Sequence, residues 1–146
     1  MANLIYNYFK RAVLQGSYVI GDSISPPIYV ALLNNSYSPN IDTDIYVGQF
    51  LGTYEVSSAG YVAGGVALSG PNAQQDDTEN QGILYGTSIL WPSVTLTARG
   101  AVLYGSSGVG FSSDPLIAYI DFGADKTASA GTFQINWNAS GILAIT

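Results

Sequence analysis

The stretch from Ala98 to Gly123 most constrains how this chain can fold. It contains two apolar segments of strand length, Ala98–Tyr104 and Leu116–Gly123, separated by a break rich in Gly and Ser. Both segments are rich in β-branched and aromatic residues and turn residues lie between them, which predicts a β-hairpin with a long loop. Because nearly every position in the two segments is apolar, we expect these strands to be buried on both faces.

Other short segments also have the composition of strands. Each combines apolar, β-branched and aromatic residues and is flanked by turn residues; these segments are residues 28–33, 54–57, 61–68, 83–85, 89–91, 94–97, 132–137 and 142–145. The pattern shows no regular alternation of strands with helices, which a parallel sheet would require. The predicted class is therefore all-β, a single antiparallel β-sandwich or small barrel with an N-terminal α-helix.

The 146 residues are expected to form one β-rich domain, with a helix or arm over residues 1–16 and the β core over residues 17–146. Residues 19–27 read as a connector, and residues 37–52 as a polar loop followed by a short helix or turn that places aromatic side chains over the core. The expected core consists of Ile28, Val30, Leu32, Val66, Leu68, Ile89, Val102, Tyr104, Ile117, Tyr119, Phe122, Phe133, Ile135 and Leu143.

Residues 3–15 are the best helix candidate. Asn3 can act as the N-cap, apolar residues recur at spacings of three and four, and Gly16 stands where a glycine ends many helices. The helix either packs on the sheet of its own domain or is an arm that docks on a neighbouring subunit.

Composition argues against catalysis. The chain has no cysteine and no histidine, so it lacks thiolate chemistry and the commonest general base and metal ligand. Ten acidic and four basic residues give a net charge of −6, and the bases are scattered, which disfavours nucleic acid as a partner. No apolar run is long enough to span a bilayer. We therefore expect no enzyme activity, no cofactor, no nucleic-acid partner and no membrane partner.

Two acidic segments raise the question of a cation site. Asp42 and Asp44 have the spacing of calcium-loop ligands, but the glycine and the distal glutamate of an EF-hand loop do not follow. The segment 71–80 carries Asp76, Asp77 and Glu79 among Gln, Asn and Thr residues. We interpret both segments as exposed loops that carry charge.

One charged pair lies within the predicted hairpin. Arg99 and Asp121 stand on opposite arms, and we expect them to form a buried structural pair that holds the strand register. A charged fraction of only 10% suggests that part of the surface is covered by other chains. The candidate interface residues are Leu4, Ile5, Tyr8, Phe9, Tyr37 and Tyr46.

Short motifs form a distinctive set over the whole chain: residues 1–7, 9–11, 61–65, 97–104, 115–123 and 137–143. With these motifs the chain resembles a widespread family of small structural proteins of tailed bacteriophages. It departs from the pattern of that family mainly over residues 16–27 and 105–114, which are less charged and less regular than expected.

The resemblance implies a virion component made in the host cytoplasm. It is most compatible with a capsid decoration, or cement, protein on the capsid surface that bridges major capsid subunits by burying surface, as a homo-oligomer and preferably a trimer. The alternative is a head–tail, neck or tail-fibre component that binds a receptor or glycan. Exposed aromatic rings at Tyr37, Tyr46 and Tyr85 would favour that alternative. A third class, a carbohydrate-active enzyme, would need two carboxylates close together in a cleft.

Overall fold

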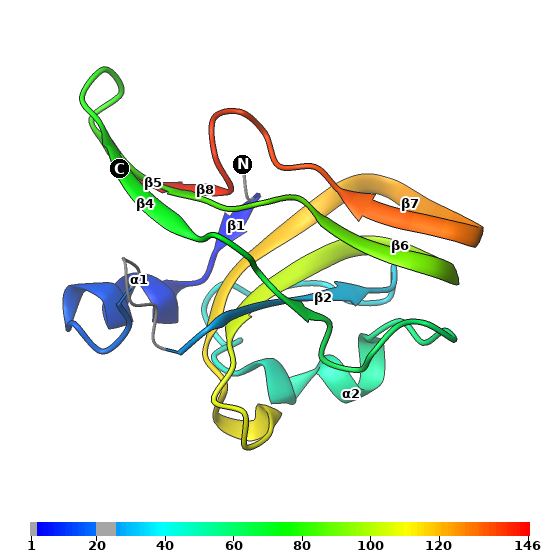
Figure 1. Ribbon diagram of the computed structural model, residues 1–146. Coiled ribbons are helices and arrows are strands. Elements are labelled where there is room, and N and C mark those ends of the chain that lie inside the picture. The colour runs from blue at the N-terminus through cyan, green and yellow to red at the C-terminus, as the bar shows by residue number, and fades with distance from the viewer. Residues whose placement is uncertain (1–2, 20–25) are drawn as a thin grey trace.

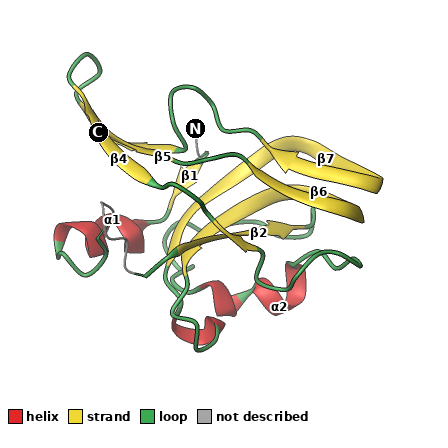
Figure 2. Ribbon diagram, viewed as in Figure 1, coloured by secondary structure: helices red, strands yellow, loops and turns green. Residues whose placement is uncertain are grey.

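The computed structural model describes residues 3–19 and 26–146, so the connector predicted at 19–27 lies mostly outside the described residues. The fold is all-β, with two antiparallel sheets and an N-terminal helix (Figures 1 and 2). The larger sheet has the order β1-β7-β6-β2-β3 and the smaller one β4-β5-β8. The strands are β1 (Leu4–Ile5), β2 (Ile28–Leu33), β3 (Val66–Ala67), β4 (Asn72–Asp76), β5 (Gln81–Tyr85), β6 (Ile89–Gly105), β7 (Leu116–Ile135) and β8 (Leu143–Ile145).

The predicted hairpin is confirmed and forms the centre of the larger sheet. β6 and β7 pair along their length and are longer than the sequence suggested, since segments predicted as separate strands join into two curved ones (Figure 1). Register shifts interrupt the pairing, and one of them spans Pro92, which has no amide proton to donate to the ladder. Because these irregularities bend the ladder without breaking it, the separate segments become continuous strands.

The larger sheet is buried on both faces. Val30 and Leu32 of β2 belong to one core cluster, whereas Ala31 and Leu33 belong to a second. Successive strand residues point to opposite faces, so the two clusters lie on the two sides of the sheet. The α1 helix (Asn7–Leu14) and the smaller sheet cover the first side, while the segment holding the 3-10 turn η1 (Val47–Gln49) and α2 (Leu51–Tyr54) covers the second.

Most residues of the expected core are buried, but Val66 and Phe122 are only half-buried. The aromatic cover predicted from residues 37–52 is confirmed, because Tyr37 and Phe50 stack with ring centroids 4.2 Å apart against the second core.

The second glycine of the pair before β3 is required by the backbone at that position. Gly65 has a φ of +77°, and a side chain there would clash with the Val30 carbonyl.

The prediction that the N-terminal helix begins at residue 3 was wrong. The helix begins at Asn7, because Leu4 and Ile5 pair with β7 and form β1. Asn3 does not cap the helix; its side chain accepts a hydrogen bond from the Asp121 amide at 2.9 Å. Long-range strand pairing overrides the local helical pattern here.

The segment 71–80 was predicted as a loop, but residues 72–76 form β4, since β5 supplies the pairing partner. Its exposure is as expected, and the acidic residues lie at the hairpin tip. Residues 54–57 and 61–68 contribute only the end of α2, a single bridge between Glu55 and Leu33, and β3. Residues 83–85 and 89–91 do not pair with each other; they lie in β5 and β6, which belong to different sheets.

Candidate functional site

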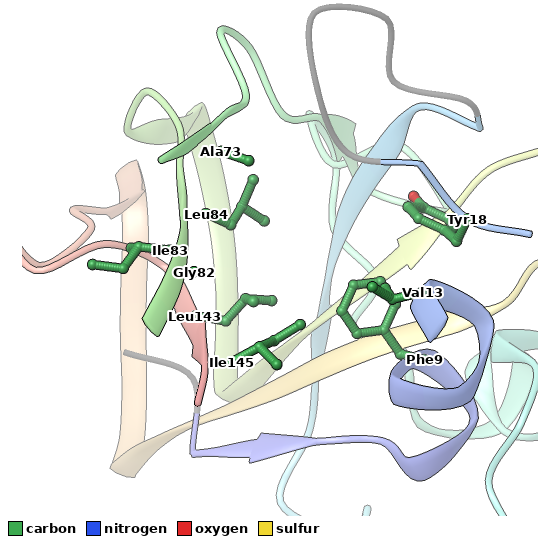
Figure 3. Close-up of a pocket in the computed structure, with 9 residues that line it drawn as sticks. All are labelled: Phe9, Val13, Tyr18, Ala73, Gly82, Ile83, Leu84, Leu143 and Ile145. Atoms are coloured by element: carbon green, nitrogen blue, oxygen red, sulfur yellow. The ribbon is translucent and has the colours of Figure 1, made fainter. Parts of the chain in front are cut away.

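An apolar groove separates α1 from the smaller sheet (Figure 3). It has a volume of about 170 Å³ and is lined by Phe9, Val13, Tyr18, Ala73, Gly82, Ile83, Leu84, Leu143 and Ile145. Phe9 and Val13 are four residues apart and share one face of the helix. Leu84 and Leu143 are cross-strand partners, so they share one face of the sheet. Both faces turn towards the groove, which is open to solvent and almost wholly apolar.

Gly82 keeps the sheet side of the groove open. It is the partner of Ile145 on β8, and a side chain at this position would meet no atom within 4 Å. The space above Gly82 is therefore left empty by the described side chains of this chain. The residues that line the groove come from α1, from Tyr18 in the segment after it, and from β4, β5 and β8, which only the fold brings together.

α1 also carries two basic side chains, Lys10 and Arg11, neither of which lines the groove. Lys10 and Arg11 are half of the four basic residues of the chain, and both are exposed. The Arg11 guanidinium lies 4.9 Å above the Tyr8 ring, and Lys10 Nζ donates to Asn7 Oδ1 at 3.5 Å. Within residues 3–19 and 26–146, neither base forms an ion pair with an acidic side chain.

Acidic side chains gather at the tip of the β4–β5 hairpin. Asp76 accepts hydrogen bonds from the amides of Thr78 and Glu79 at 2.9 and 3.2 Å, which hold the pKa of its carboxyl below the usual value and stabilise the turn. Asp77 and Glu79 extend into solvent from this turn.

The predicted interface residues do not form one surface. Tyr37 is only 7% exposed and Phe9 is buried, so both belong to the core. Leu4 and Ile5 are half-buried in β1. Tyr8 and Tyr46 are half-buried and lie together with ring centroids 5.6 Å apart, and the neighbouring Tyr8 hydroxyl raises the pKa of Tyr46.

The Tyr37 hydroxyl is the centre of a hydrogen-bond network inside the protein. It donates to Asp44 Oδ2 at 2.8 Å and lies 2.8 Å from the hydroxyl of fully buried Tyr6. Because Tyr37 uses its proton on Asp44, Tyr6 donates to Tyr37. Burial raises the pKa values of both tyrosines, which keeps them neutral. Asp44 therefore serves this network, and its spacing from Asp42 has a structural explanation.

Arg99 and Asp121 form the expected pair across the hairpin. Arg99 Nε donates to Asp121 Oδ1 at 2.7 Å and Nη2 to Oδ2 at 3.3 Å, which lowers the pKa of Asp121. The expectation of burial was wrong: the side chains are 36% and 39% exposed. The pair lies beside Gly100, where the β6–β7 ladder shifts register between Ala98 and Gly100.

A second hollow lies beside α2. Leu51, Ala63 and Phe111 contribute apolar walls, and Glu55 and Tyr61 lie at its edge. Glu55 accepts hydrogen bonds from the Tyr61 hydroxyl at 2.8 Å and the Gly64 amide. Burial raises the pKa of Glu55 despite these bonds. The carboxylate therefore ties the loop before β3 to α2 at a cost in desolvation.

A third, more polar hollow of about 430 Å³ runs along β7. The half-buried ring of Phe122 lies at one side, and its centroid is 6.0 Å from that of Phe133. The hydroxyl of Thr132 and the amides of Gln134 and Asn136 also line the hollow.

Among the residues that the structure describes, no group of three or more His, Cys, Asp or Glu side chains gathers in a way that could hold a metal ion. Neither described α-helix has the length and apolar character that crossing a bilayer requires.

The groove was not found from the sequence, although one signal was present. Apolar residues continue to the end of the helix at Val13 and Leu14 and through the C-terminal strand at Ile145. Which strands would face the helix depended on the pairing of β5 with β8, and local sequence patterns do not reveal such pairing. No family model, no curated protein and no solved structure matches the chain.

Proposed function

We propose that this chain is a structural protein of a tailed-phage virion, and specifically a capsid decoration protein. It would act by burying surface between neighbouring major capsid subunits, as a homo-oligomer on the outside of the shell and without catalysis. The resemblance of its motifs to small phage structural proteins supports this proposal.

Two separate apolar hollows are the observation that carries it. One lies beside α1 and the other beside α2, and these two helices lie at different sides of the molecule (Figure 1). Large apolar side chains are exposed near both, with Leu14 at the end of α1 and Phe111 in the hollow beside α2. A protein that bridges subunits needs two contact surfaces, and exposed apolar surface of this kind marks interaction sites.

The test is the copy number of this protein in purified particles of the phage that encodes it. Quantitative mass spectrometry would compare it with the major capsid protein in the same sample. A copy number close to that of the major capsid protein supports decoration of the shell. A copy number of only a small fraction of it indicates a neck or fibre position, and absence from the particle overturns a virion role.

Glycan binding by a neck or tail-fibre component is the second candidate. The hollow along β7 favours it, because an aromatic ring beside hydroxyl and amide groups suits a sugar. The tyrosines named for this role give little support, since Tyr37 is buried and Tyr46 and Tyr85 are half-buried. Chemical shifts of the β7 amides during titration with oligosaccharides would test it, with a Phe122→Ala variant as the control. Shifts that are the same in both proteins would exclude this hollow as the site.

A further inference from the structure

We propose that the hollow beside α2 receives a lysine side chain of the capsid subunit that this protein covers, with Glu55 as the counter-ion of its ammonium group. This inference rests on the proposed function, in which the hollow is one of two contact surfaces, and it names the chemistry of the partner there. Three features lead to it: a carboxylate oxygen with no donor among the described residues, a charge that no base of this chain compensates, and apolar walls around both.

Glu55 lines the hollow with one oxygen occupied and the other free. Oε1 accepts hydrogen bonds from the Tyr61 hydroxyl at 2.8 Å and from the Gly64 amide at 2.6 Å. Oε2 accepts none from residues 3–19 and 26–146, and solvent reaches it, because the one sealed side-chain polar atom without a partner in those residues is Trp91 Nε1. The half-buried carboxylate therefore offers a free acceptor oxygen.

No base of this chain compensates the charge of that carboxylate. The chain has four basic residues, all in its described part, and none of them lines the hollow. The one ion pair among the described residues joins Arg99 to Asp121. Burial raises the pKa of Glu55, so desolvation disfavours its ionised form. A cation supplied by a partner would offset this cost, because an opposite charge nearby favours the ionised carboxylate.

The remaining walls suit the four-carbon stem of a lysine, which buries well along apolar surface. Leu51, Ala63 and Phe111 contribute apolar surface to the hollow, which has a volume of about 370 Å³. The Phe111 ring packs on Gly64, since a side chain there would come within 3.0 Å of it. An aromatic ring thus lies next to the residue whose amide donates to Glu55, and such a ring also attracts a cation.

A lysine fits the free oxygen better than an arginine does. A guanidinium binds a carboxylate best through two parallel hydrogen bonds, which require both oxygens. Oε1 of Glu55 already accepts from two donors, so only one oxygen is left. An ammonium is compact and can donate to a single oxygen. The exposed Ser57 hydroxyl lines the same hollow and provides a second acceptor.

NMR titration of the isotope-labelled full-length protein tests the site. The probes are the N-acetyl methylamides of lysine, arginine and norleucine, and norleucine has the stem of lysine without the ammonium group. The Gly64 amide is the reporter, because it donates to Glu55. We expect the lysine probe to shift this resonance at millimolar concentration. The arginine probe should bind more weakly, and the norleucine probe about tenfold or more weakly, because it lacks the charged hydrogen bond.

Two variants with matched controls assign the binding to this hollow. Glu55→Gln keeps an acceptor for Tyr61 and Gly64 but removes the charge, so the lysine probe should bind about tenfold or more weakly. Its control, Glu79→Gln, removes one charge at the exposed tip of the β4–β5 hairpin and should bind normally.

The second variant, Gly52→Phe, fills the hollow, because Gly52 lines it and an added side chain there meets no atom within 4 Å. We expect this variant to remain folded and to lose binding of the lysine probe. Gly82→Phe, which lies in equally open space on β5, is its control and should bind normally. The amide spectrum of each variant shows whether it is folded.

A cross-linking experiment on purified virions identifies the partner. A carbodiimide joins a carboxylate to an amine that touches it, so we expect it to link Glu55 to a lysine of the major capsid protein, which mass spectrometry of the linked peptides would locate. A protein that does not bind the lysine probe, or that binds the arginine or norleucine probe equally well, overturns the proposal. So does a Glu55→Gln or Gly52→Phe variant that binds as tightly as the wild type, or a virion in which Glu55 is linked to no capsid lysine.

The copy number of the protein in the virion is independent of these outcomes. An abundant virion protein that binds no lysine probe would refute the lysine site and keep the proposed function. A protein that binds the lysine probe through Glu55 but is absent from virions would refute the proposed function and the capsid partner together, while its hollow would remain a site for an ammonium group.

Discussion

Replacing Tyr37 by Phe tests whether this residue belongs to the folded core or to an interface. The change keeps the ring that stacks on Phe50 at 4.2 Å, and it removes only the hydroxyl. The Tyr6 hydroxyl, which is fully buried, then loses its acceptor. Asp44 loses one donor but keeps the Asn40 amide at 2.8 Å.

The cost follows from which group is left unpaired. A buried hydroxyl without a partner costs about 1–3 kcal/mol, whereas the half-exposed Asp44 can replace its lost donor by water. We therefore expect Tyr37→Phe to lower the free energy of unfolding by about 2 kcal/mol. Adding Tyr6→Phe removes the orphaned hydroxyl, so the double variant should be more stable than Tyr37→Phe alone, with a net loss of about 1 kcal/mol.

Urea denaturation followed by tryptophan fluorescence measures these differences, since Trp91 is buried in the core. The Tyr6→Phe variant alone is the control, and it should lose only about 0.5–1 kcal/mol because Tyr37 still donates to Asp44. A double variant less stable than Tyr37→Phe would refute the assigned direction of the Tyr6–Tyr37 bond. A Tyr37→Phe variant as stable as the wild type, but defective in assembly, would return Tyr37 to the interface.

Three further outcomes are expected. Gly65→Ala should destabilise the fold by about 3 kcal/mol or more in the same assay, because a side chain there meets a β2 carbonyl and the φ is positive. Gly108→Ala is the control, since Gly108 has a positive φ but open space around it, and it should cost only about 1–2 kcal/mol. Equal losses of stability in the two variants would contradict the clash at Gly65. Burial raises the pKa of Glu55, so its protonated form favours the folded state, and this contribution is lost as pH rises from 4.5 through the folded pKa. Glu55→Gln should therefore lack the fall in melting temperature that the wild type shows over that pH range. If the variant shows the same fall, a group other than Glu55 causes it. The Arg99–Asp121 pair lowers the pKa of Asp121, so Arg99→Gln should reduce the stability of the folded protein above pH 3.8. This loss of stability should disappear as pH falls through the lowered pKa that Asp121 has in the folded protein. A loss that persists in strong acid would contradict an ionic origin.

Patterns confined to a few neighbouring residues were interpreted correctly from the sequence. The all-β class, the hairpin around residues 105–115 and the doubly buried strands all follow from apolar runs bounded by turn residues. Gly16 follows the end of α1 as predicted, and its φ is +67°. These features depend on local sterics and on burial, which the order of residues expresses directly.

Other features depended on partners far away in the chain. Leu4 and Ile5 became a strand because β7 offers an open edge, and the polar residues 72–76 became a strand because β5 offers another. Tyr37 looked like an exposed loop residue, but its hydroxyl finds Tyr6 and Asp44 in the interior. Backbone pairing and buried hydrogen bonds outweigh local propensity in these cases.

The sequence by itself determined the class of the fold, the low fraction of charged residues and the lack of histidine and cysteine chemistry, because these follow from composition and short-range pattern. Only the tertiary structure decided which apolar residues line an open groove at the surface. The groove between α1 and the smaller sheet joins Phe9 and Val13 to Leu84 and Ile145, which are far apart in the chain. Its position follows from the pairing of β5 with β4 and β8, a long-range choice that no single segment encodes.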